Sequence, residues 1–133
     1  MTRRQAREQA FILIFEKSFH PETTVEEMIA AAEEARYLQA DEFAVLLAKT
    51  EQEKQAEIDA MIEQNAIGWR KDRLARVSLA LLRLALCEML YIEDVPVNVS
   101  INEAVELAKA YATPEDASFI NGVLGTVSRR LEA

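Results

Sequence analysis

The chain has 133 residues, which suits one domain with a buried core. Half of these residues are hydrophobic and only three each are glycine and proline, so an all-helical fold is favoured over a sheet. The formal net charge of −8 opposes strong binding to nucleic acid. The acids are unevenly spread, however: residues 21–66 hold twelve acids against three bases, whereas residues 1–20 hold four bases against two acids. A phosphate-binding face can therefore still be built from the two ends of the chain.

The first half of the chain is expected to form three helices. The first covers about 3–18, with Thr2 as its N-cap and a broad apolar stripe. The second begins at Thr24, which forms a capping box with Glu27, and ends near residue 37. The third begins near Asp41, and a break in the pattern at 65–68 predicts a hinge. We therefore expect a single domain of two packed helical groups, about 1–65 and 66–133.

The second half is expected to add three helices, giving about six or seven in all. Residues 72–91 are apolar around most of the helix circumference, which places this helix at the centre of the fold. Ser100 followed by Glu103 has the pattern of a capping box, so the next helix is expected to begin at Ser100, after Pro96. Thr113 and the proline after it end that helix and begin the last one, which runs to about residue 131.

Neither a membrane span nor catalytic chemistry is predicted. No apolar run approaches the roughly 18 residues of a span, and the single Cys87 cannot form an internal disulfide, which is typical of a cytoplasmic protein. One histidine, His20, and three scattered glycines exclude a Cys/His pair, a zinc cage and a P-loop. We therefore expect a cytoplasmic protein that is not an enzyme and needs no metal or cofactor.

Arg3, Arg4 and Arg7 open the first expected helix, and Arg3 and Arg7 share one of its faces. Arginine side chains match the oxygens of phosphate groups, and a helix N-terminus also favours anions. The cluster is therefore a candidate contact to RNA. The alternative is a helix start whose charges only keep the protein soluble.

A second group of bases lies just before the fourth expected helix and along one of its stripes. Its members are Arg70, Lys71, Arg73, Arg76 and Arg83. They predict either a second track for phosphates or ion pairs with the acids of residues 21–66. Trp69 beside them either stacks on a base or fills a junction between helices.

The last expected helix carries a more specific group. Gly122 costs a helix about 1 kcal/mol relative to alanine, so its presence indicates that another helix or a ligand approaches its backbone closely. Helix packing would explain Gly122 but not its neighbours. Asn121 can read a base edge, and Phe119 can stack beneath a base.

Three acids lie at and after the end of the apolar helix 72–91. Glu88 is inside the helix, while Glu93 and Asp94 are in the following turn. Acids at a helix C-terminus oppose the helix dipole, so a role in binding a basic partner is attractive. The alternative is an ion pair between Glu88 and Arg83, or a solvated loop.

Two segments carry a resemblance to a known family. Residues 95–109 read VPVNVSINEAVELAK, and residues 118–124 read SFINGVL. Spaced in this way, they resemble the NusB family of transcription antitermination factors. The arginine-rich start is similar to that family too, where it belongs to the RNA surface. Gly125 departs from the pattern, because members of the family usually carry an acid there.

The resemblance implies a compact all-α fold that binds a short single-stranded boxA-type RNA together with the ribosomal protein NusE, in a transcription complex with RNA polymerase. The candidate RNA contacts are Arg3, Arg4, Arg7, Lys109, Phe119, Asn121 and Gly122. The candidate contacts to NusE are Glu88, Glu93 and Asp94.

Two alternatives stay open. The fold also resembles the N-terminal RNA-binding domain of ribosomal RNA cytosine methyltransferases, and the net charge favours a helical adaptor that binds only protein. The oligomeric state, monomer or homodimer, is open as well.

Overall fold

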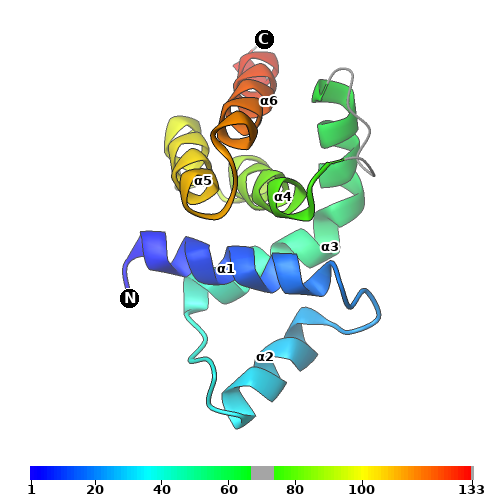
Figure 1. The fold of residues 1–133 in the computed structure, drawn as a ribbon, viewed down its shortest axis with the longest axis vertical. Helices are drawn as coiled ribbons and strands as arrows, with labels where there is room; N and C mark the ends of the chain where they lie inside the picture. Colours follow the sequence, from blue (N-terminus) through cyan, green and yellow to red (C-terminus); the bar gives the residue numbers. More distant parts are fainter. Residues whose placement is uncertain (67–73, 133) are drawn as a thin grey trace.

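The computed structural model describes residues 1–66 and 74–132, which form six α-helices and no strand (Figure 1). The helices are α1 (Arg3–Lys17), α2 (Val25–Glu34), α3 (Glu42–Asn65), α4 (Arg76–Tyr91), α5 (Val97–Tyr111) and α6 (Pro114–Glu132). The expected all-α class is confirmed. The expected start of the fourth helix at Asp72 lies outside the described residues, and α4 is described from Arg76 onward.

The first three helices begin where their capping residues predict. The Thr2 hydroxyl accepts a hydrogen bond from the Gln5 amide at 3.1 Å, and the Gln5 side chain accepts one from the Thr2 amide at 2.8 Å. Thr24 and Glu27 form the same reciprocal pair at the start of α2. The Asp41 carboxylate accepts from two amides in the first turn of α3. These contacts satisfy amides that have no partner within the helix.

The expected start of α5 at Ser100 is wrong. The helix begins at Val97 with Pro96 at its N-cap, because the fixed φ of proline suits a helix start. Ser100 is only 2% exposed, and its hydroxyl donates to Glu88 Oε1 at 2.6 Å instead of capping the helix. The Glu103 side chain likewise turns to α1, where it pairs with Arg4.

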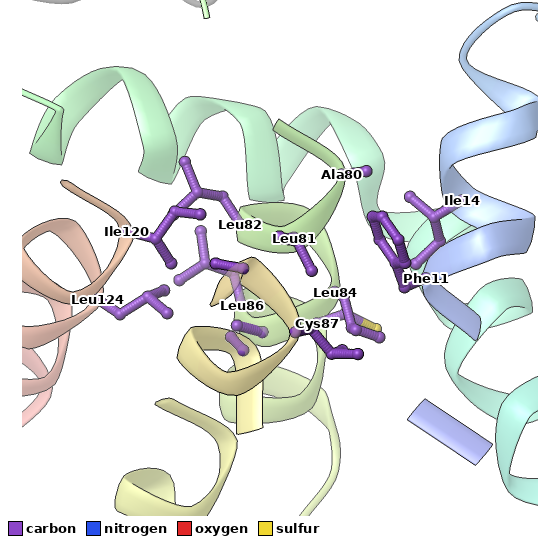
Figure 2. Packing of buried hydrophobic residues seen from close by; sticks show 14 of the residues in the cluster. Phe11, Ile14, Ala80, Leu81, Leu82, Leu84, Leu86, Cys87, Ile120 and Leu124 are labelled. Carbon is purple, nitrogen blue, oxygen red and sulfur yellow. The ribbon is translucent and has the colours of Figure 1, made fainter. Parts of the chain in front are cut away.

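The main hydrophobic core surrounds α4, in which every residue from 80 to 88 is buried. One side of α4 faces α1, where Phe11 and Ile14 approach it, and the other side faces Ile120 and Leu124 of α6 (Figure 2). The central position expected for this helix is confirmed. The core draws on both 1–65 and 66–133, so the two expected groups of helices share one interior. A smaller cluster beneath α2 contains Leu13, Val25, Ile29 and Ala48.

Candidate nucleic-acid interface

The N-terminus of α1 presents two exposed arginines. Arg3 lies over the ring of Phe43, with its guanidinium carbon 3.9 Å from the ring centroid. Arg4 keeps a side chain that is 66% exposed, and its Nε donates to Glu103 Oε2 at 2.9 Å. This hydrogen bond and the charge of Glu103 raise the pKa of Arg4. Both guanidinium groups keep N–H donors that can form hydrogen bonds to phosphate oxygens.

Arg7 and Glu88 are not at the surface. Arg7 Nε donates to both oxygens of Glu88, at 3.1 and 2.9 Å, and the two side chains are only 8% and 2% exposed. The Ser100 hydroxyl donates to the same carboxylate. The expected roles of Arg7 in RNA binding and of Glu88 in partner binding both require an accessible side chain, so this geometry does not fit them. The sequence offered Arg83 as the ion-pair partner of Glu88, but the structure pairs Glu88 with Arg7.

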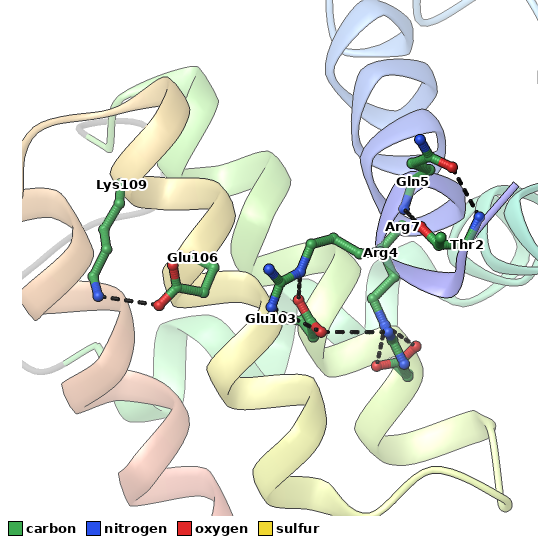
Figure 3. A network of polar contacts seen from close by, with 8 residues as sticks. Thr2, Arg4, Gln5, Arg7, Glu103, Glu106 and Lys109 are labelled. Carbon is green, nitrogen blue, oxygen red and sulfur yellow. Dashed lines mark hydrogen bonds and ion pairs between the residues drawn. The ribbon is translucent and has the colours of Figure 1, made fainter.

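Glu103 joins the buried pair to the surface. Besides its contact with Arg4, one of its oxygens lies 4.0 Å from Arg7 Nη1. Figure 3 shows Arg4 and Glu103 joined between α1 and α5, with Glu106 and Lys109 further along α5. Lys109 Nζ donates to Glu106 Oε1 at 3.1 Å, and both of these side chains are at least half exposed. Arg4 and Lys109 are therefore each paired with an acid of α5.

A groove of about 600 Å³ continues this face between α5 and α6. Lys109 and Asn121 line its two sides. Asn121 is exposed, and within the described part of the chain its amide has no hydrogen-bond partner, so both its donors and its acceptor are available. Gly122 beside it is also exposed, and a Cβ built there would meet nothing within 4 Å. Packing against a helix of the described chain therefore does not account for this glycine.

Phe119 lies on another side of α6. Residues two positions apart in an α-helix are related by a rotation of about 200° around its axis. Phe119 and Asn121 therefore point in nearly opposite directions. Phe119 is half-buried and packs against the main core. Its expected role as a stacking platform beside Asn121 does not fit this position.

The remaining candidates fall into three groups. Glu93 and Asp94 are exposed in the turn between α4 and α5 and stay available to a partner. Arg83 forms a buried pair with Asp59 of α3, as the ion-pair alternative predicted, with bonds of 2.9 and 3.0 Å. Arg76 donates to the Ser18 carbonyl at the end of α1. Trp69, Arg70, Lys71 and Arg73 lie outside the described residues.

Sequence reasoning also missed a contact between α1 and the end of α5. The Tyr111 hydroxyl donates to Glu8 Oε2 at 2.9 Å, and this hydrogen bond raises the pKa of Tyr111. The Tyr111 ring lies 4.9 Å from that of Phe11, centroid to centroid. The first half of α1 is thus joined to α5 at two points, by Arg4–Glu103 and by Glu8–Tyr111. No local pattern predicts pairs that are about a hundred residues apart.

The described residues offer little for catalysis. Burial raises the pKa of the Cys87 thiol to about 12, so this thiol is a poor nucleophile. Over residues 1–66 and 74–132, no cluster of histidine, cysteine and acidic side chains has the arrangement of a metal site. Within the same residues, no helix is long and apolar enough to cross a membrane. The fold and this face define a protein whose described residues are all-helical, with a candidate binding surface across α1, α5 and α6.

The model of the NusB family matches residues 4–129, and the chain belongs to this family. Two curated transcription antitermination proteins NusB are similar to it over nearly their whole length. The protein from Natranaerobius thermophilus is 40% identical, covering 98% of this chain and 97% of its own. The protein from Carboxydothermus hydrogenoformans is 43% identical, covering 99% and 96%.

Solved structures show the same fold. A structure of T. maritima NusB has a TM-score of 0.82 and 30% identity, covering 97% of this chain and 92% of that one. A crystal structure of the antitermination factors NusB and NusE in complex with double-stranded RNA contains a chain with a TM-score of 0.83 and 26% identity. That match covers 98% of this chain and 99% of the other.

Proposed function

We propose that this protein is a transcription antitermination factor that binds boxA-type single-stranded RNA across α1, α5 and α6, together with NusE. The observation that carries the proposal is the exposed Arg4, joined to α5 through Glu103, together with the groove between α5 and α6 that Lys109 and Asn121 line. Membership of the NusB family and the name of its curated relatives support it. A relative crystallised with both NusE and RNA supports the pairing of the two partners.

The protein acts by assembly rather than by chemistry. Arg4 and Lys109 are each held by an acid, so a phosphate must compete with Glu103 or Glu106 for them. Together with the net charge of −8, this competition keeps the affinity of the isolated protein for RNA low. NusE adds a second contact, and two linked weak contacts bind far more tightly than either alone. Glu93 and Asp94, exposed beyond α4, are the acids offered to a basic partner. The assembled complex then acts on RNA polymerase.

The competing function is an adaptor that binds only protein, which the net charge favours. A filter-binding titration of boxA-like and scrambled RNA at several salt concentrations, with and without NusE, separates the two. An RNA-binding factor prefers the boxA-like sequence, most clearly with NusE present. No binding of either RNA under any of these conditions would leave the adaptor as the function.

Replacing Arg3 and Arg4 together by alanine is expected to weaken RNA binding and to flatten the dependence of log K on log salt by roughly 1–2 units. Two phosphate contacts are lost, while the exposed positions leave the fold nearly unchanged. The matched control replaces Arg129 and Arg130, two exposed arginines near the end of α6, by alanine. It alters the net charge equally, and a slope that falls as much in the control removes Arg3 and Arg4 from the interface.

Gly122→Ala is expected to stabilise the protein and to weaken RNA binding at the same time. Alanine is favoured over glycine inside a helix by roughly 0.5–1 kcal/mol, and the added methyl group meets open space. The same methyl group would obstruct an RNA strand that approaches this backbone. Thermal unfolding and RNA titration of one preparation measure both effects. A stabilised variant with unchanged RNA affinity would show that the strand passes elsewhere.

A further inference from the structure

A basic cavity lies at the other end of α1, away from the candidate RNA face. It has a volume of about 440 Å³ and is lined by the end of α1 and the loop after it, by α3 and by the start of α4. Three of its described lining residues are bases, Lys17, Arg76 and Arg83, and none of those described is an acid. In a chain with 23 acids and 15 bases, such a lining is unusual and indicates affinity for an anion.

The three bases are held in place by contacts that leave donors unused. Lys17 Nζ donates to the carbonyls of Pro21 and Thr23, at 3.0 and 2.7 Å. Arg76 Nη1 donates to the Ser18 carbonyl at 2.8 Å, and its guanidinium lies over the ring of Phe19. An ammonium group has three donors and a guanidinium five, so each side chain keeps at least one N–H for a ligand. Fixed side chains lose little entropy when they bind.

Two acids stand behind the cavity and reduce its positive charge only in part. Asp59 accepts two hydrogen bonds from Arg83, whose side chain is 9% exposed. The other N–H donors of that guanidinium do not bond to Asp59. Glu51 is buried, and burial raises the pKa of its carboxyl group, which favours the uncharged form. Within residues 1–66 and 74–132, Lys17 and Arg76 are paired with backbone carbonyls and not with carboxylates. The described part of the lining therefore keeps a net positive charge.

We propose that this cavity binds a small anion that carries a diphosphate group. Arginine and lysine are the side chains that best recognise phosphate, and the volume is within the range of roughly 300–1,000 Å³ typical of small-molecule sites. Leu74, Leu79 and Pro21 add an apolar wall that suits an attached organic group. The 15 residues of α1 separate this cavity from the Arg3–Arg4 end by roughly 20 Å, so the two sites are independent.

Calorimetric titration of the full chain at low salt tests the proposal, with inorganic pyrophosphate and ADP as the probes. We expect saturable binding of pyrophosphate at one site, weakened about tenfold or more in Arg76→Gln and in Lys17→Gln. The matched control is Arg130→Gln, which removes the same charge from an exposed position of α6 and should change the affinity less than about twofold. Tighter binding of ADP than of pyrophosphate assigns the ligand to nucleotides, and equal binding assigns it to pyrophosphate itself.

Three results would overturn the proposal. One is the absence of saturable binding to the unmodified protein, and another is an equal loss in Arg130→Gln and in both cavity variants. The third is competition between pyrophosphate and boxA-like RNA, which would place the anion on the α1–α5 face. Using Lys17→Gln beside Arg76→Gln keeps the test valid if one of them fails to fold. Because the cavity and the RNA face are tested separately, failure of one does not affect the other.

Discussion

Replacing Glu88 by lysine is expected to unfold the protein rather than to remove a surface contact. Glu88 is 2% exposed and accepts hydrogen bonds from Arg7 and Ser100, so the change places two positive charges together in the interior. Removing one partner of a buried ion pair costs about 3–5 kcal/mol, and reversing its charge costs more. A domain of this size has a total stability of roughly 5–15 kcal/mol. Urea unfolding followed by circular dichroism should therefore show little or no folded protein.

Glu93→Lys is the matched control, because it makes the same charge change at an exposed position two residues beyond α4. Its unfolding free energy should stay within about 0.5 kcal/mol of the unmodified protein. If Glu93 contacts NusE, this control also loses NusE binding while it stays folded. A Glu88→Lys variant that is stably folded and defective only in NusE binding would restore Glu88 to the partner surface.

Helix starts were predictable from the sequence where the capping contacts are local. The Thr2, Thr24 and Asp41 side chains bond to amides within three residues, and these three helices begin as predicted. Ser100 has the same local pattern, but a buried carboxylate on α4 accepts its hydroxyl instead. A capping motif predicts a helix start only if no partner from another element takes its side chain. That condition depends on the tertiary structure.

The buried ion pair was missed although the sequence holds a signal for it. Arg7, Phe11 and Ile14 follow one another at helical spacing, so Arg7 lies on the apolar stripe of α1. Glu88 lies within the nine buried residues of α4. Two opposite charges, each on the apolar face of its own helix, indicate a buried pair, because neither can be buried alone. Periodicity does not reveal which acid meets which base.

The exposed residues of the candidate face were easier to select from the sequence. Arg3, Arg4, Lys109 and Asn121 are exposed, and their residue types suit RNA. The groove that brings Lys109 and Asn121 together depends on how α5 packs on α6, which no local pattern contains. Phe119 is only two positions from Asn121, yet the helical rotation turns it to the core. Nearness in the sequence was the wrong criterion for a shared site.

Asp59→Ala is expected to destabilise the protein by about 3–5 kcal/mol, because it leaves the buried guanidinium of Arg83 without its carboxylate. Replacing both residues by apolar ones of similar size, Asp59→Leu with Arg83→Met, is expected to be nearly neutral or stabilising. The double change removes the cost of burying two charges and fills the same space. Urea unfolding of the single and double variants measures the coupling between the two sites.

The double variant also links stability to the basic cavity. It should remain folded and yet bind pyrophosphate at least about tenfold more weakly, because Arg83 supplies one of the three positive charges of the lining. Arg3 and Arg4 are untouched, so RNA binding with NusE should be retained. A cost below about 1 kcal/mol for Asp59→Ala alone would mean that the pair behaves as a solvated surface contact. The guanidinium would then not be fixed in the cavity wall, and the cavity would lose one of its three held cations.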